Sequence, residues 1–77
     1  MANQEQVSAS NALAREMGKD AAFRDKQVGH DRSHETLRSY ARELMNRLLG
    51  GQAESTIAGA TDAWMRGYEG FMQEIKH

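Results

Sequence analysis

The sequence predicts an all-α protein. The chain of 77 residues contains no proline, and the β-branched residues that favour strands are few beside the helix-favouring ones. In the second half, large apolar side chains recur at spacings of three and four, which is the period of an amphipathic helix. Glycines at positions 18, 29, 50 and 51 divide the chain. We therefore expect one small helical domain over residues 1–77.

The N-terminal segment, residues 1–28, has the weakest pattern. Its large apolar side chains, which include Leu13, Met17 and Phe23, do not fall on one helical face. A broken helix over residues 10–27 is one interpretation. An arm that orders only on a partner is the other, because a polar segment with few large apolar groups cannot offset its own ordering entropy. We expect an N-terminal helical or partly disordered segment that is flexible or binds a partner.

A helix is predicted at about 31–49. Asp31 or Ser33 can cap its first turn, and Gly50 suits the left-handed position after its last turn. Its apolar stripe is predicted from side chains at helical spacing, which are Leu37, Tyr40, Ala41, Leu44 and Leu48.

A second helix is predicted at about 54–75, with Ser55 as its cap. Its large side chains also recur at helical spacing, and they are Ile57, Trp64, Tyr68, Phe71 and Ile75. Aromatic residues at spacings of four and three are typical of a helix that fills a core, so we expect packing here and not a ligand cage.

The predicted protein interface combines small residues with methionines. Two glycines inside a helix cost roughly 1 kcal/mol each relative to alanine, and close approach of another helix would offset this cost. The alternative is that these glycines loosen or end the helix early. Methionines at the flanks of the apolar stripes, where a single copy should leave them partly exposed, suit adaptable binding surfaces. The predicted interface residues are Ala60, Ala63, Gly67, Gly70, Met45, Met65 and Met72.

The two predicted helices should form an antiparallel hairpin closed by Gly50 and Gly51. A single core in so short a chain rarely supplies more than about 3–5 kcal/mol. We therefore expect a second copy to complete a dimeric helical bundle.

Composition narrows the functional classes. The absence of cysteine excludes disulfides and thiolate chemistry, and it favours a reducing, cytoplasmic location. No apolar run reaches the ~20 residues that a membrane span needs. Ten basic residues against eleven acidic ones give a net charge of -1. This balance argues against a protein that binds mainly by neutralising phosphates.

Candidate chemical sites are weak. His30 and His34 have the i, i+4 spacing of metal ligands, but a closed site needs three or four ligands, so ordinary residues at a helix start are the preferred interpretation. The arginines between residues 31 and 50 are largely cancelled by nearby acids, which leaves nucleic-acid binding as the less favoured possibility. No paired nucleophile and base is recognisable. We expect no catalytic residue, no cofactor and no metal.

The expected function is stoichiometric binding of a partner chain by a small, non-enzymatic regulatory protein that also self-associates. An adaptor, an inhibitor, a chaperone or a phage or plasmid accessory factor would all fit. The alternative is a dimeric helical nucleic-acid-binding regulator.

Overall fold

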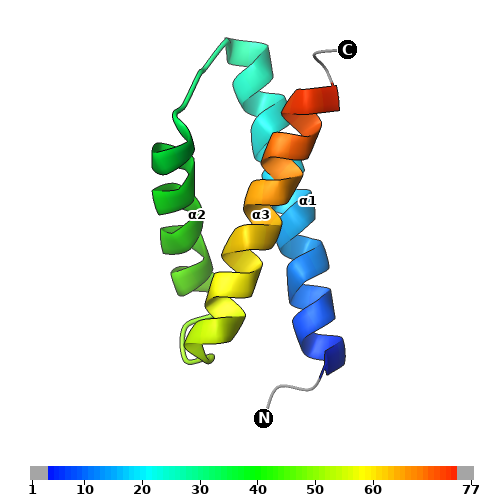
Figure 1. Cartoon of the computed structure of the whole chain (residues 1–77), viewed down its shortest axis with the longest axis vertical. Helices are drawn as coiled ribbons and strands as arrows, with labels where there is room; N and C mark the ends of the chain where they lie inside the picture. The colour runs from blue at the N-terminus through cyan, green and yellow to red at the C-terminus, as the bar shows by residue number, and fades with distance from the viewer. Residues whose placement is uncertain (1–3, 75–77) are drawn as a thin grey trace.

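The computed structural model describes the backbone of residues 4–74 and the side chains from residue 10 to residue 74. This part of the chain is all-helical. It contains α1 (Gln4–Val28), α2 (His34–Leu48) and α3 (Glu54–Glu74). Helices α1 and α3 run in the same direction, and α2 runs in the opposite direction (Figure 1).

Helix α1 covers residues 4–28 and continues without a break through Gly18, so the interpretation of a broken helix over residues 10–27 was wrong. It ends at Gly29, whose φ of 68° is left-handed. The amide of Gly29 donates to the carbonyl of Lys26 at 3.3 Å, and the amide of His30 donates to the carbonyl of Asp25 at 2.8 Å. These two bonds form a Schellman motif, which satisfies carbonyls that would otherwise be unpaired at the helix end.

Helix α2 begins after Ser33, one of the two caps expected from the sequence. The Thr36 amide donates to the Ser33 hydroxyl at 3.2 Å, which satisfies a free donor of the first turn. The prediction that Gly50 takes the left-handed conformation was wrong, because Gly51 takes it, with φ 93°. The helix itself ends at Leu48, with Leu49 as its cap.

Helix α3 begins at Glu54, so Ser55 lies within the first turn and the expectation that it caps the helix was wrong. The helix continues through both Gly67 and Gly70 to Glu74. The interpretation that these glycines end the helix early is therefore also wrong. Ile75, the last predicted residue of the apolar stripe, lies outside the described residues.

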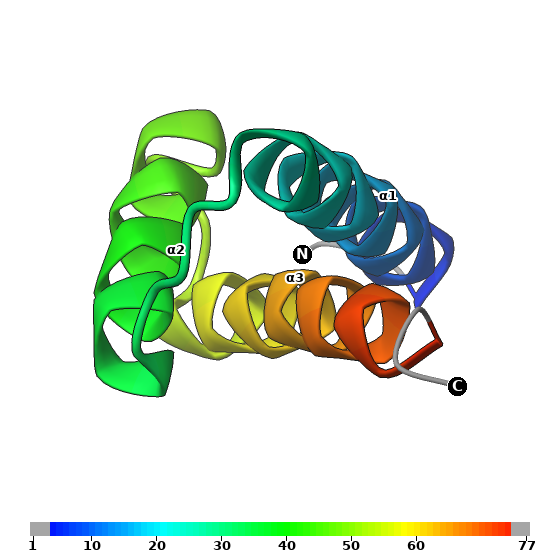
Figure 2. The same ribbon diagram turned by 90° about the horizontal axis from the view of Figure 1, so that it is seen from above.

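Helix α3 is the central element of the fold. Helices α1 and α2 both pack against α3, whereas no close backbone contact joins α1 to α2 in the described residues. Seen along the helices, α1 and α2 lie on different sides of α3 (Figure 2). The predicted α2–α3 hairpin is present, but α1 makes the more extensive contact with α3. The core residues are Ala14, Ala22, Leu37, Ala41, Met45, Ile57, Ala60, Ala63, Trp64, Met65 and Tyr68.

The apolar stripe predicted for α2 is displaced in the structure. Leu37 and Ala41 are buried as expected, but the next buried residue is Met45. Tyr40 and Leu48 are 47% and 54% exposed, so these two members of the predicted stripe are not buried. The physical reason is the position of α3, which lies on the Leu37, Ala41 and Met45 side of α2.

Candidate functional site

The closest helix contact among the described residues is a seam of small residues between α1 and α3. A β-carbon on Gly18 would lie 2.0 Å from the carbonyl oxygen of Trp64, and one on Gly67 would lie 2.1 Å from the carbonyl oxygen of Arg15. Both distances are far below van der Waals contact. The two backbones can approach this closely only because these positions carry no side chain.

The helix that covers the predicted small-residue row is α1 of the same chain. Three residues of this row on α3 are buried, namely Ala60, Ala63 and Gly67. The matching row on α1 consists of Ala14, Gly18 and Ala22, each buried. Sequence reasoning missed these α1 residues, although their i, i+4 spacing of small side chains was a signal for close helix packing.

The remaining predicted interface residues lie on or near the chain's own core. Met45 and Met65 are 2% and 4% exposed, so the expectation that they sit partly exposed at the flanks was wrong. Met72 is partly buried against the core. Gly70 is partly exposed, and a β-carbon there would have no neighbour within 4 Å. Most of the predicted interface set therefore offers little accessible surface.

A buried polar cluster joins the end of α1 to α3 and to the loop before α2. The Asp25 residue is only 6% exposed. Its carboxylate accepts a 2.5 Å hydrogen bond from the Tyr68 hydroxyl and a 3.2 Å hydrogen bond from the Arg32 guanidinium. Burial and, to a lesser extent, the hydrogen bond to Asp25 together raise the pKa of Tyr68 to about 12. The cluster is a satisfied buried network, which orients the elements that carry it.

Three neighbouring aromatic rings continue from this cluster. The rings of Trp64 and Tyr68 are stacked at 5.4 Å, and the ring of Tyr40 on α2 lies 5.7 Å from Trp64 in a tilted arrangement. The Arg32 guanidinium lies 5.5 Å from the centre of the Tyr40 ring. Arg32 therefore contacts both the Asp25 carboxylate and Tyr40, which links α1 to α2 through the loop.

The two candidate metal ligands point to different partners. The Nδ1 atom of His30 lies 3.8 Å from Asp25, whereas Nδ1 of His34 lies 2.8 Å from a Glu69 carboxylate oxygen on α3. Within the described part of the chain, no three histidine, cysteine or acidic residues are placed to hold a metal ion.

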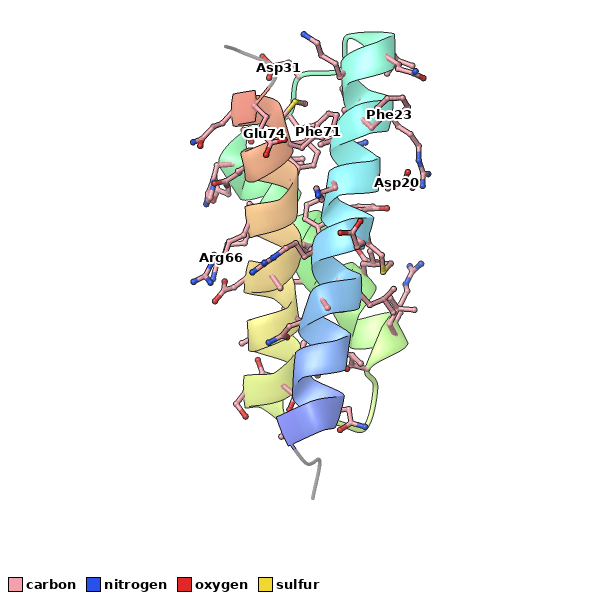
Figure 3. The ribbon with its side chains drawn as sticks, turned by 90° about the vertical axis from the view of Figure 1, so that its right-hand side faces the viewer. Asp20, Phe23, Asp31, Arg66, Phe71 and Glu74 are labelled. Atoms are coloured by element: carbon pink, nitrogen blue, oxygen red, sulfur yellow. The ribbon has the colours of Figure 1, made fainter. Side chains whose placement is uncertain are left out.

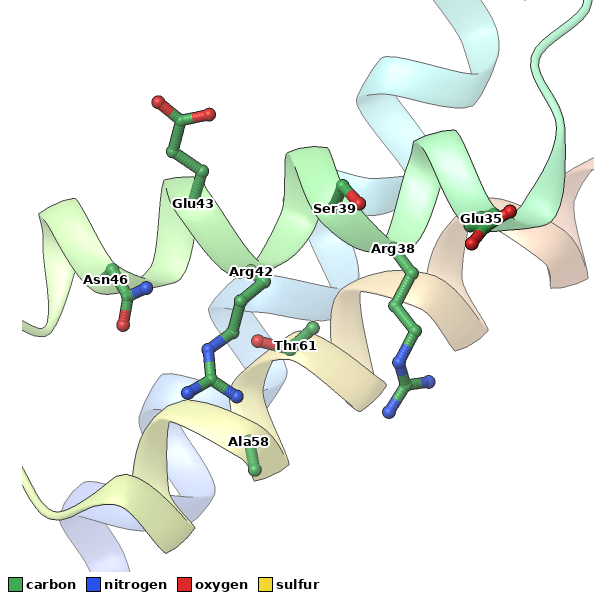
Figure 4. A pocket seen from close by; sticks show the side chains of 8 residues that line it. All are labelled: Glu35, Arg38, Ser39, Arg42, Glu43, Asn46, Ala58 and Thr61. Atoms are coloured by element: carbon green, nitrogen blue, oxygen red, sulfur yellow. The ribbon is translucent and has the colours of Figure 1, made fainter.

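A polar groove of about 540 Å³ runs between α2 and α3. The Arg38 and Arg42 side chains extend from α2 over this groove towards α3 (Figure 4). Arg38 lies 3.4 Å from Asp62, and Arg42 pairs with Glu54. These arginines are paired with acids of α3, so their charge is partly neutralised. The lining residues are Glu35, Arg38, Ser39, Arg42, Glu43, Asn46, Ala58 and Thr61.

The second surface feature is apolar and lies between α1 and α2. Leu13 on α1 and Leu48 on α2 line a cavity of about 50 Å³, and they are 62% and 54% exposed. Met45 lies among the lining residues and is buried. The other lining residues are Ser10, Ala14, Met17 and Leu49. We call this surface, together with the partly exposed Tyr40 and Leu44 of α2, the α1/α2 groove.

A smaller apolar contact lies on another side of the molecule. Phe23 on α1 meets Phe71 on α3 edge to face, with ring centres 6.1 Å apart, near the end of the two helices (Figure 3). Phe23 is half exposed, but its ring already has an aromatic partner within the chain. The exposed leucines of the α1/α2 groove, Leu13 and Leu48, are more exposed than Phe23.

Comparison with known proteins identifies no relative. No family model, curated protein or solved structure matches the chain. No helix in the described residues has the length and apolar character to cross a membrane.

Proposed function

We propose that the protein is a non-enzymatic interaction module that binds another helical protein chain over the α1/α2 groove. One observation carries the proposal: α1 and α2 both pack on α3 without close backbone contact with each other, and exposed leucines line the surface between them. In a four-helix bundle, a further helix covers such a surface. An amphipathic helix laid into an apolar groove is a common mode of peptide recognition.

The charges beside the groove indicate the chemistry of the partner. On α1 the exposed ion pair of Asp20 and Arg24 follows Met17, and on α2 the exposed pair of Glu43 and Arg47 flanks Leu44. Both signs are present on both sides. The partner should therefore present an apolar stripe flanked by acidic and basic residues, and it should not be a strongly charged peptide.

Self-association belongs to the same proposal. A small core gives limited stability, and covering exposed leucines with a second chain would increase it. Nucleic-acid binding is the less favoured function. The arginines of α2 at positions 38, 42 and 47 are each paired with an acid of the same chain, which reduces the charge available to phosphates.

Groove variants test the proposal. Leu13→Glu and Leu48→Glu place a charge on the exposed apolar surface, and Ala12→Glu and Asn46→Glu are matched controls on neighbouring exposed positions outside it. Chains captured from the native host with the parent should be identified, and the affinity of each purified chain should be measured for all variants. We expect the groove variants to lose affinity at least tenfold, by more than about 1.4 kcal/mol, while the controls keep it. Equal affinity for all four variants would reject the groove as the binding site.

A further inference from the structure

We propose that the exposed face of α2 is the contact surface between two copies of this chain, which pack with their α2 helices antiparallel. The inference rests on the proposed function, because it names a second copy as a partner at the α1/α2 groove. It goes further by fixing the orientation of the copies and the residue pairs at their contact.

The contact surface is a hollow on α2. Tyr40, Glu43, Leu44 and Arg47 line a concavity of about 160 Å³. Their numbers have the pattern i, i+3, i+4, i+7, which is the set of four residues that receives one side chain of a facing helix in knobs-into-holes packing. The hollow therefore has the form of a helix-packing site that lacks its second helix.

The charged side chains of this hollow on one copy match those of the same hollow on a second, antiparallel copy. Glu43 and Arg47 form an exposed i, i+4 pair at 3.0 Å. Two identical α2 helices can pack antiparallel about a twofold axis that is perpendicular to them and passes between Glu43 and Leu44. In this arrangement Arg47 lies level with Tyr40 of the second copy and within one turn of its Glu43. Each guanidinium then meets the Glu43 carboxylate, and this contact between opposite charges is favourable. The Tyr40 ring adds less to this contact, because the Arg32 guanidinium of its own copy already lies 5.5 Å from its centre. A twofold axis repeats these contacts, so the surface recognises itself.

The antiparallel orientation also fits the rest of the fold. Helices α1 and α2 already run in opposite directions on this side of the molecule (Figure 1). A second copy that packs face to face about the same axis adds two more helices, each antiparallel to its neighbours. The result is a four-helix bundle formed by α1 and α2 of both copies, with the apolar side chains of Leu13, Met17 and Leu44 inside it.

Exchanging the charges tests the residue pairs. Glu43→Arg brings two arginines together, because the introduced side chain lies near the Arg47 of the second copy. Arg47→Glu likewise brings two glutamates together. The two native side chains are 68% and 75% exposed, so each variant should keep the fold. Sedimentation equilibrium should show the parent as a dimer. The dissociation constant of the dimer should be at least roughly tenfold higher for each variant alone. Circular dichroism checks that helicity is unchanged.

Mixing the two variants is the decisive measurement. In a mixed dimer, the arginine introduced by Glu43→Arg faces the glutamate introduced by Arg47→Glu, and the remaining native Arg47 faces the remaining native Glu43. Both contacts are therefore again between opposite charges. We expect an equimolar mixture to recover a dimer with affinity within a few-fold of the parent, and the recovery to weaken in 1 M salt. A parent that stays monomeric at several hundred micromolar overturns the inference, as do single variants that dimerise as well as the parent or a mixture that does not recover.

These results separate the inference from the proposed function. A parent that is monomeric but binds a host chain through Leu13 and Leu48 would retain the groove and exclude the second copy. If the groove variants bind the host chain as well as the parent does, the groove is instead rejected as the binding site.

Discussion

Gly67 lies directly against the backbone of Arg15. A β-carbon at Gly67 would lie only 2.1 Å from the Arg15 carbonyl oxygen. The atom that would be met belongs to the backbone, so no side-chain rotation can relieve the clash. The cost of a glycine inside α3 is therefore offset by the close packing of α1, which a larger residue would prevent.

Gly67→Ala should destabilise the protein by about 1–3 kcal/mol, because the new methyl group must push α1 away from α3. Gly70→Ala is the matched control. It has open space around it and lies on the same helix, so the better helix propensity of alanine should stabilise the protein by up to about 1 kcal/mol. Urea denaturation of both variants measures the difference. Equal stability of the two variants would show that the seam is not tightly packed.

Met45→Ala should cost about 2–5 kcal/mol, because Met45 is almost fully buried and its removal leaves a cavity. Leu48→Ala should change the stability of the monomer by less than about 1 kcal/mol, because Leu48 is half exposed. Thermal unfolding at low protein concentration compares the two. A larger loss of stability for Leu48→Ala than for Met45→Ala would show that Leu48 belongs to the buried face of α2, as the sequence predicted.

Tyr68→Phe should destabilise the protein by about 1–3 kcal/mol below pH 10, because Asp25 loses a buried hydrogen-bond donor. The pKa of Tyr68 is raised from 10 to about 12 in the folded protein, so the folded state holds this proton more tightly than the unfolded state does. Its contribution to stability is therefore complete below pH 10 and is lost as the pH rises from 10 to 12.

Unfolding midpoints of the parent and of Tyr68→Phe, measured from pH 8 to pH 12, should converge over that upper range. Absorbance at 295 nm gives an independent check, because the difference between the parent and the variant is the titration of Tyr68 alone. A midpoint for this difference near pH 10 would contradict the burial of the Tyr68 hydroxyl.

Arg38→Gln should change stability by no more than about 0.5 kcal/mol, because both Arg38 and Asp62 are about half exposed and water screens their attraction. The small effect should vanish in 0.5 M salt. Chemical denaturation at two salt concentrations measures it. A loss above 1 kcal/mol would mean that the ion pairs between α2 and α3 stabilise the protein far more than their exposure suggests.

The sequence predicted the elements whose buried residues are large. Trp64 and Tyr68 repeat at helical spacing and are buried as expected, and Ser33 could be recognised as a cap from its side chain alone. The packing of α1 could not be predicted from large apolar side chains, because its fully buried residues are the small Ala14, Gly18 and Ala22 and the polar Asp25. Its larger apolar side chains are only partly buried or exposed. Hydrophobic periodicity gives such a face little weight.

The candidate site was predicted less well than the fold. The small-residue row does pack closely against another helix, but the neighbour in the structure is α1, which sequence periodicity could not place. Met45 is buried, and Leu48 is exposed, because of the side on which α3 lies across α2. That arrangement depends on contacts between distant parts of the chain, so local spacing does not determine it. The α1/α2 groove depends on the same arrangement.

The parallel arrangement of α1 and α3 also governs how the chain folds. Tyr68 and Asp25 form their hydrogen bond across 43 positions of the sequence, and among the described residues α1 makes close backbone contact with α3 alone. During synthesis, α1 is therefore made long before α3 exists, and closing this long loop should limit the folding rate. Until then the glycine-containing face of α1 is uncovered. In a crowded cell, an α3 from a neighbouring chain could take the place of the missing one, which makes exchange of α1 between chains the expected misfolding route.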